Sequence, residues 1–201
     1  MKLYYTPGVC SLASHIALRE TGAEFDLVRV DLQTKQTENG DDYLKICRHG
    51  KVPALDIGEG PVLTENPAIL QYVADRNPSA GLIPQAGTLE RYRLQSWLSY
   101  LGSELHKCFG PLFQPGHGEE SKKLAIEGIH RHFAALDELL STQDYLTGDR
   151  FTVADAYLFV ILGWPNLIGL DMARYSGLQP YAGRIAARDG VQAALKAEGL
   201  A

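Results

Sequence analysis

The feature that most constrains the fold is a change of pattern at residues 77–88, a stretch that holds two prolines and two glycines. Such a density of helix and strand breakers marks a linker. Before it, strand-like and helix-like segments alternate, and after it almost every segment has helical apolar spacing. We therefore expect an α/β domain over residues 1–78, a linker over 79–88 and an all-α domain over 89–201.

The segments of the first domain follow the order β-α-β-α-β-β-α. They are expected at residues 2–5, 11–21, 25–31, 38–46, 52–57, 62–64 and 65–76. The first two strands, joined by a helix, should be parallel, and the last two should form a hairpin. This order predicts a thioredoxin-like sheet, in which ligands bind outside the carboxyl ends of the strands. The loop over residues 6–11, which contains Cys10, is therefore where chemistry is expected.

The second domain is expected to be all-helical. Four helical segments are predicted, over residues 88–113, 126–140, 154–162 and near 180–197. Apolar residues at 3.6-residue spacing give the first two a buried stripe, and the third is almost entirely apolar, as a core helix would be. Thr152 and Asp155 have the spacing of a capping box at the start of that third helix.

Composition narrows the classes of partner. The net charge is −5, which argues against a nucleic-acid surface. No apolar stretch approaches the ~20 residues that a membrane span needs, and the apolar run at the N-terminus is too short for a signal peptide, so we expect a cytoplasmic protein. Three cysteines, at positions 10, 47 and 108, do not suggest a disulfide framework. The histidines show no spacing typical of metal ligands, and no metal is expected.

Cys10 stands at the start of the helix that follows the first strand. Unpaired N–H groups and the helix dipole at such a position favour an anion, and can lower a thiol pKa from about 8.5 to roughly 3.5–7.5. The alternative is a small buried residue at a tight turn. Three residues further on stands Ala13 rather than a second cysteine, which argues against a dithiol oxidoreductase and favours a single working thiol.

The whole chain resembles the cytosolic glutathione transferases, and most closely their bacterial beta class. Each matching block is weak by itself, but together, in order and at matching spacing, they are specific. The blocks are residues 1–15, 38–43, 52–55, 64–65, 68–72, 104–107 and 151–157. The resemblance implies the glutathione transferase fold, with a thioredoxin-like N-terminal domain and an all-helical C-terminal domain. It also implies glutathione as co-substrate and a homodimer.

The resemblance implies a cis bond before Pro53, which would turn the backbone of Val52 towards the cysteinyl part of glutathione, as one strand pairs with another. An ordinary edge proline is the alternative. Lys35 matches the family lysine that pairs with the glycyl carboxylate. By itself, Lys35 is one lysine in a polar loop.

Glu65 and Asn66 begin a predicted helix, where backbone N–H groups suit a carboxylate and a nearby Glu suits an ammonium group. The γ-glutamyl end of glutathione carries both. Relatives often have Ser where this chain has Asn66, whose side chain can still donate. The alternative for Glu65 is a residue that only satisfies the helix dipole.

Ser99, Ser103 and His106 are spaced i, i+4, i+7 and share one face of the predicted helix over 88–113, opposite the apolar stripe. Spacing alone favours a solvated face. The resemblance instead places this face, with Lys107, at the active-site cleft and the dimer partner. There His106 would stabilise a thiolate or move a proton. Ser99 and Ser103 would reach glutathione held by the other subunit, although many relatives have Asn at position 99.

The predicted function is a glutathione S-transferase that conjugates the glutathione thiol to small apolar electrophiles, with Cys10 and His106 as catalytic residues. Thiol-disulfide exchange through Cys10 is a further activity that a free thiol permits. A non-catalytic ligand-binding or regulatory protein of the same fold is the alternative, and an isomerase or dehalogenase is a nearer one. The second substrate is expected in an apolar cleft between the domains, walled by Tyr5, Phe109, Phe113, Trp164 and Leu167.

Overall fold

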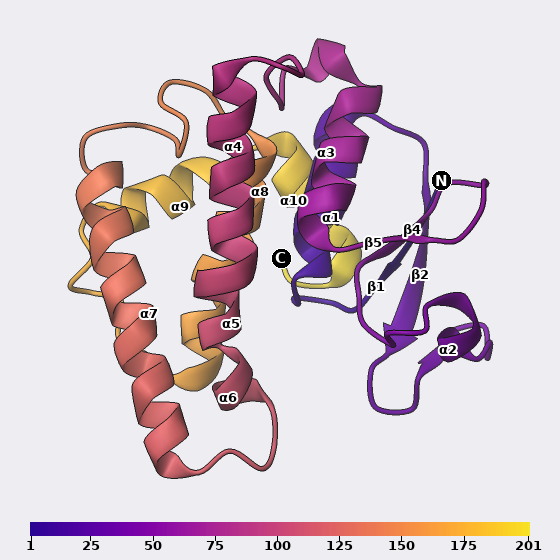
Figure 1. Ribbon diagram of the computed structural model, residues 1–201, viewed down its shortest axis with the longest axis horizontal. Helices are drawn as coiled ribbons and strands as arrows, with labels where there is room; N and C mark the ends of the chain where they lie inside the picture. The colour runs from indigo at the N-terminus through magenta and orange to yellow at the C-terminus, as the bar shows by residue number, and fades with distance from the viewer. The chain divides into compact units, whose positions relative to one another are not determined.

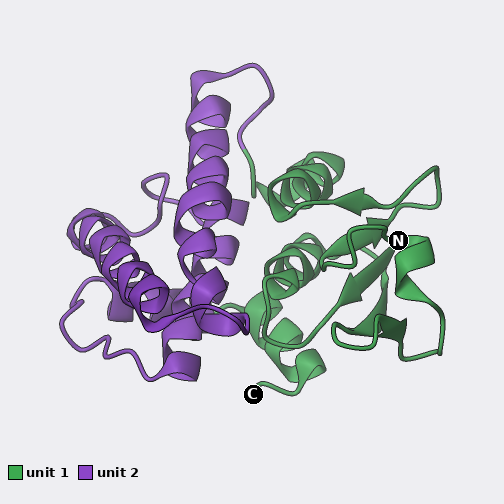
Figure 2. Cartoon of the chain, turned by 60° about the horizontal axis from the view of Figure 1, so that its bottom comes forward, with its two compact units in different colours: residues 1–83, 187–201 green, residues 84–186 purple.

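The computed structural model describes residues 1–201, which form two compact units (Figure 2). Unit 1 comprises residues 1–83 and 187–201, and unit 2 comprises residues 84–186. The expected helical domain over 89–201 therefore extends too far. Residues 187–201 belong to unit 1, because helix α10 (Asp189–Glu198) packs on helix α1 (Ser11–Thr21).

Unit 1 is built on a five-stranded sheet in the order β3-β2-β1-β4-β5. The strands are β1 (Lys2–Tyr5), β2 (Asp26–Asp31), β3 (Gln36–Thr37), β4 (Ala54–Asp56) and β5 (Leu63–Thr64). β1 and β2 are parallel, and β4 and β5 form an antiparallel hairpin, as the sequence predicts. β4 also pairs antiparallel with β1. The short strand β3 was not predicted, because two residues carry no recognisable alternation.

Helices cover both faces of this sheet (Figure 1). α1 and α3 (Asn66–Arg76) pack together on one face, with α10 beside α1. The short helix α2 (Tyr43–Ile46) lies on the other face, where Tyr4 and Ala54 pack with Tyr43 and Cys47. Because successive strand side chains alternate between faces, this arrangement buries residues on both sides of β1 and β4. A short 3₁₀ helix, Pro78–Ala80, follows α3 near the end of residues 1–83.

Unit 2 is helical throughout. Its segments are α4 (Leu89–Tyr100), a π-helical segment (Leu101–Leu105), α5 (His106–Cys108), α6 (Gly110–Phe113), α7 (Glu119–Leu140), α8 (Val153–Gly163), a 3₁₀ helix (Trp164–Ile168) and α9 (Leu178–Ala186). The predicted helix over 88–113 is thus four consecutive pieces. The π-helical segment has i→i+5 bonds, so the regular i, i+4, i+7 face assumed for Ser99, Ser103 and His106 is broken between them.

The core of unit 2 is α8, whose residues are almost all buried. Its predicted capping box is confirmed: the Asp155 carboxylate accepts hydrogen bonds from the Thr152 N–H and hydroxyl, each at 2.8 Å. The same buried carboxylate also accepts from the Leu146 N–H and the Tyr181 hydroxyl, and so ties α8 to two other segments. None of the helices combines the length and the apolar character that crossing a bilayer would require.

Candidate functional site

The loop between β1 and α1 places Cys10 at the N-cap of α1. Ser11 holds the loop, since its hydroxyl donates to the Thr6 carbonyl and accepts from the Thr6 N–H. The half-buried Cys10 thiol donates to the Val52 carbonyl oxygen, with Sγ 3.2 Å from that oxygen. The structure thus brings two of the predicted site residues into direct contact.

Burial, and not the helix start, dominates the ionisation of Cys10. Removal from water raises the pKa of the Cys10 thiol to about 12, and the N–H groups of Cys10 and Ser11 and the charge of Lys51 lower it by less. The carboxylate of Glu65 adds to the increase. The expectation of a lowered thiol pKa is therefore wrong for the ligand-free protein. Near neutral pH Cys10 is a neutral hydrogen-bond donor.

The backbone carbonyls of Lys51 and Val52, in the segment that faces Cys10, accept hydrogen bonds from the side chains of two other segments. The peptide bond between Val52 and Pro53 is cis, as the resemblance implies. The Tyr43 hydroxyl donates to the Lys51 carbonyl at 2.8 Å, one residue before the carbonyl that Cys10 contacts. The Val52 N–H has no acceptor within the protein. A peptide-like ligand could therefore pair with the backbone of Val52 as with a strand edge.

Glu65 and Asn66 lie where β5 gives way to α3. Glu65 is exposed and has a φ of +68°, a conformation that a residue with a side chain adopts at a cost of ~1–3 kcal/mol. Such strained positions cluster at ligand-binding sites. The Asn66 side chain is buried, and its amide nitrogen donates to the Cys10 carbonyl while its oxygen accepts from Ser14, both at 2.7 Å. Its amide therefore braces the Cys10 loop, and the Asn66 backbone N–H is the group left at the helix start.

Lys35 lies at the other end of the segment that leads to Val52. Its ammonium group donates to the Gly50 carbonyl at 2.8 Å, which leaves two of its three protons for other acceptors. Gly50 has a φ of +58°, and a Cβ there would lie 2.9 Å from the Leu44 side chain. The positive φ favours glycine at this position, while the exposed Leu44 side chain could move away from a Cβ. The structure places the Lys35 ammonium group beside the segment that leads to Val52.

A further contact with the Cys10 loop comes from the last helix and was not predicted from the sequence. The buried Glu198 carboxylate of α10 accepts from the Gly8 N–H and pairs with His15 Nδ1, both at 2.9 Å. Arg19 Nε donates to His15 Nε2, so His15 carries its proton on Nδ1 and donates it to Glu198. Glu198 is one polar residue in an amphipathic helix far along the chain, and nothing local distinguishes it from a surface residue.

In unit 2, the structure places His106 among aromatic side chains. Its Nδ1 lies 2.7 Å from the Tyr157 hydroxyl, and its ring centroid lies 4.7 Å from that of Trp164. The other predicted residues of this region, Ser99, Ser103 and Lys107, are exposed. Unlike His106, they are not packed into the unit.

Three of the predicted wall residues form one aromatic cluster. Phe109, Phe113 and Trp164 have centroid separations of 5.3 to 5.9 Å. Phe113 is 46% exposed and the neighbouring Leu167 is 71% exposed, so an apolar surface remains open to solvent. Tyr5, the fifth candidate, is buried in unit 1.

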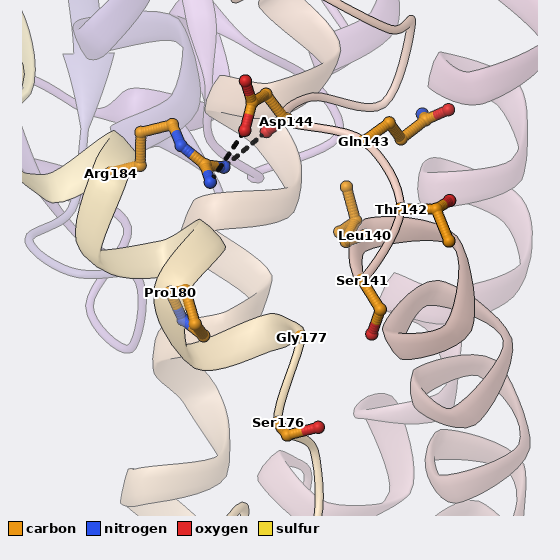
Figure 3. Close-up of a pocket in the computed structure, with 9 residues that line it drawn as sticks. All are labelled: Leu140, Ser141, Thr142, Gln143, Asp144, Ser176, Gly177, Pro180 and Arg184. Carbon is orange, nitrogen blue, oxygen red and sulfur yellow. Dashed lines mark hydrogen bonds and ion pairs between the residues drawn. The ribbon is translucent and has the colours of Figure 1, made fainter.

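A cavity of about 460 Å³ lies elsewhere in unit 2, where α7 ends and α9 begins (Figure 3). It is polar, and Arg184 forms an ion pair of 2.9 Å with Asp144 at its edge. Neither this cavity nor a smaller one beside Trp97 includes any predicted glutathione ligand. The structure holds no cluster of three or more side chains suited to a metal ion.

Known proteins are similar to this chain in sequence and in fold over its full length. Residues 1–75 match the family model of the glutathione S-transferase N-terminal domain, and residues 86–184 match that of the C-terminal domain. Glutathione S-transferase GstA of Escherichia coli O157:H7 is 45% identical over 200 residues, with 100% of both chains covered. A sphingomonad glutathione S-transferase, solved in complex with glutathione, is 58% identical with a TM-score of 0.96 and 100% coverage of both chains. A bacterial beta class glutathione S-transferase of Sphingomonas chungbukensis is also 58% identical, with a TM-score of 0.97 and the same coverage.

Proposed function

The chain belongs to the glutathione S-transferase family, with its similarity to the bacterial beta class, and from this premise we propose how its residues carry out the reaction. The protein is a transferase that uses glutathione as co-substrate. Its relatives support the catalytic function over a non-catalytic role of the same fold. The contact between the Cys10 thiol and the Val52 carbonyl is the observation that carries the proposal.

In the proposal, glutathione lies extended along Val52. The Val52 backbone pairs with the cysteinyl residue, and the Lys35 ammonium group binds the glycyl carboxylate. The Asn66 N–H at the start of α3 binds the γ-glutamyl carboxylate, and the exposed Glu65 carboxylate binds its ammonium group. Pro53 shapes the turn that presents Val52.

Cys10 acts in this scheme as a hydrogen-bond donor and not as a nucleophile. Its neutral S–H, which donates to Val52 in the ligand-free protein, turns to the glutathione sulfur and stabilises the thiolate. Because burial raises the pKa of the Cys10 thiol, little of it is thiolate at pH 7, and the proposal assigns disulfide exchange through Cys10 a minor part.

Unit 2 supplies the second half of the proposal. His106 donates a second hydrogen bond to the thiolate, and Lys107 adds positive charge. A small apolar electrophile packs against Phe109, Phe113 and Trp164. In a homodimer, Ser99 and Ser103 contact glutathione bound to the other subunit. The proposed enzyme is cytoplasmic and acts on small molecules, and its net charge of −5 disfavours binding to nucleic acid or to an anionic membrane surface.

The test compares the wild type with Cys10→Ala and Cys10→Ser. We measure conjugation of glutathione to an activated aryl halide, thiol transfer from a mixed disulfide, and retention on immobilised glutathione. Conjugation should fall in Cys10→Ala and be partly restored in Cys10→Ser, since a hydroxyl can also donate. If both variants kept full conjugation, or if Cys10→Ser lost thiol transfer alone, the proposed role of Cys10 would be wrong. Retention on glutathione without turnover of any electrophile would instead support a binding protein.

A further inference from the structure

Unit 2 contains three histidine–tyrosine pairs, and one of them includes the proposed catalytic His106. Nδ1 of His106, His132 and His130 lies 2.7, 2.8 and 2.6 Å from the hydroxyl of Tyr157, Tyr100 and Tyr175 respectively. The three pairs are alike in chemistry and distance. Removal of one tyrosine hydroxyl at a time therefore separates two effects. One is the contribution that any histidine–tyrosine hydrogen bond makes to stability, and the other is the contribution of the Tyr157 bond to the reaction.

The His106 ring is held by two aromatic side chains. Tyr157, on the buried helix α8, is 2% exposed, and its ring stands edge-on to His106 at an interplanar angle of 89°. Trp164, which is 4% exposed, packs against the same imidazole at 60°. The π-helical segment ends at Leu105, immediately before His106, and helices often adopt π geometry at functional positions. Rotation of the imidazole would break the bond to Tyr157 and this packing together.

The bond to Tyr157 also decides which ring nitrogen carries the proton. A phenol, with a pKa near 10, is a far stronger acid than the N–H of a neutral imidazole. The Tyr157 hydroxyl therefore donates, and Nδ1 accepts. With Nδ1 an acceptor, the neutral ring carries its proton on Nε2.

We propose that Tyr157 is a positioning residue that holds His106 as its Nε2–H tautomer, so that His106 meets the glutathione sulfur as a hydrogen-bond donor. This inference rests on the proposed function, in which His106 serves the glutathione thiol. Without the Tyr157 hydroxyl, the ring exchanges between two tautomers, although aromatic packing still holds it in place. The thiolate then loses part of a hydrogen bond to a charged group, which is worth about ten- to a hundredfold in an equilibrium constant.

The first experiment observes the tautomer directly. Histidine ¹⁵N spectra are recorded at neutral pH for the ligand-free wild type, Tyr157→Phe and the matched control Tyr175→Phe, and the His106 signals are assigned by their loss in His106→Ala. We expect a protonated Nε2 on His106 in the wild type and in Tyr175→Phe, and averaged signals in Tyr157→Phe. A wild-type His106 that is protonated on Nδ1, or an unchanged tautomer in Tyr157→Phe, would overturn the proposal.

The second experiment asks whether Tyr157 acts through His106. The ionisation of bound glutathione is followed by thiolate absorbance against pH, and kcat/KM is measured for conjugation to an aryl halide. Tyr157→Phe should raise the thiol pKa and lower kcat/KM about tenfold in the wild-type background, and should have less than about a twofold effect in His106→Ala. Tyr175→Phe should lower thermal stability about as much as Tyr157→Phe does. It should leave the pKa of the bound thiol and kcat/KM unchanged.

Equal losses in both backgrounds would show a merely structural role and would sink the inference. Failure of the proposed function has a different signature. In that case, His106→Ala would leave both the bound-thiol pKa and kcat/KM unchanged, whatever tautomer the ¹⁵N spectra report.

Discussion

At the scale of single residues, burial and tertiary contacts decide the properties of the side chains at the site more than their position at the start of a helix does. Cys10 begins a helix, which by itself favours a thiolate, yet burial raises its pKa to about 12. Asn66 begins another helix, yet its side chain turns inward and ties the Cys10 carbonyl to Ser14. In both cases, the contact made in the folded chain decides what the residue does.

Alkylation of Cys10 should follow its raised pKa. In the ligand-free protein, the rate of reaction with iodoacetamide should still rise about tenfold per pH unit above pH 9, because the reactive thiolate grows in proportion until the pH nears the pKa of about 12. Peptide mass spectrometry separates Cys10, on the tryptic peptide 3–19, from Cys47 and Cys108. A rate that levels off below pH 8 would contradict the raised pKa.

Replacement of Asn66 by alanine should loosen the Cys10 loop. The change removes the Asn66 hydrogen bonds to the Cys10 carbonyl and to the Ser14 hydroxyl, which should cost about 1–3 kcal/mol in the free energy of unfolding in urea. The KM for glutathione should rise several-fold as well. Asn77→Ala is the matched control, since it removes the hydrogen bond that the Asn77 side-chain amide donates to the Val73 carbonyl at the other end of α3. An equal rise of KM in both variants would refute a specific role for Asn66.

At the scale of secondary-structure elements, helix α10 connects the end of the chain to the loop that carries Cys10. Glu198 holds both the Gly8 N–H and His15, while Arg188 forms an ion pair of 2.7 Å with Glu20 of α1. The buried residues of α10, Val191 and Ala194, complete the contact with α1. The helix is therefore part of the framework of the glutathione site.

Glu198→Ala should weaken that framework strongly, because it leaves a buried histidine and a loop N–H without their acceptor. We expect a loss of about 1–3 kcal/mol in the free energy of unfolding for each donor left without an acceptor, and a higher KM for glutathione. Glu198→Gln keeps one oxygen acceptor and should be affected less. Lys196→Ala, at an exposed position of the same helix, is the control. Unfolding curves of Glu198→Ala that overlay those of the control would rule out this role.

At the scale of the whole molecule, the two compact units do not follow the order of the chain. Unit 1 is closed by residues 187–201, which return to it after all of unit 2 has been traversed (Figure 2). The stability of the sheet domain therefore depends on the last helix of the chain. A truncation near the C-terminus is in effect a change in the N-terminal unit.

Removal of residues 187–201 should show this dependence. Hydrogen exchange should lose protection in α1 and in the Cys10 loop, while α8 in unit 2 should keep most of its protection. Deletion of the exposed Ala201 alone is the control. Loss of protection confined to unit 2 would mean that α10 does not stabilise unit 1.

Local sequence patterns were sufficient to predict one group of features. The parallel first pair of strands, the hairpin of the last two, the helical second unit, the capping box of Thr152 and Asp155 and the cis Val52–Pro53 bond were all predicted from spacing or from family motifs. Each depends on residues close together in the chain, or on a motif shared with relatives. Periodicity and short motifs report such features directly.

Tertiary structure alone decided the remainder. It placed α10 in unit 1, withdrew the half-buried Cys10 thiol from water and paired it with Val52, joined Glu198 to Gly8, and set the Tyr157 hydroxyl against His106. These contacts join residues that are distant in sequence. The loss of water around a side chain, which sets the cost of ionising it, exists only once those distant segments have packed together.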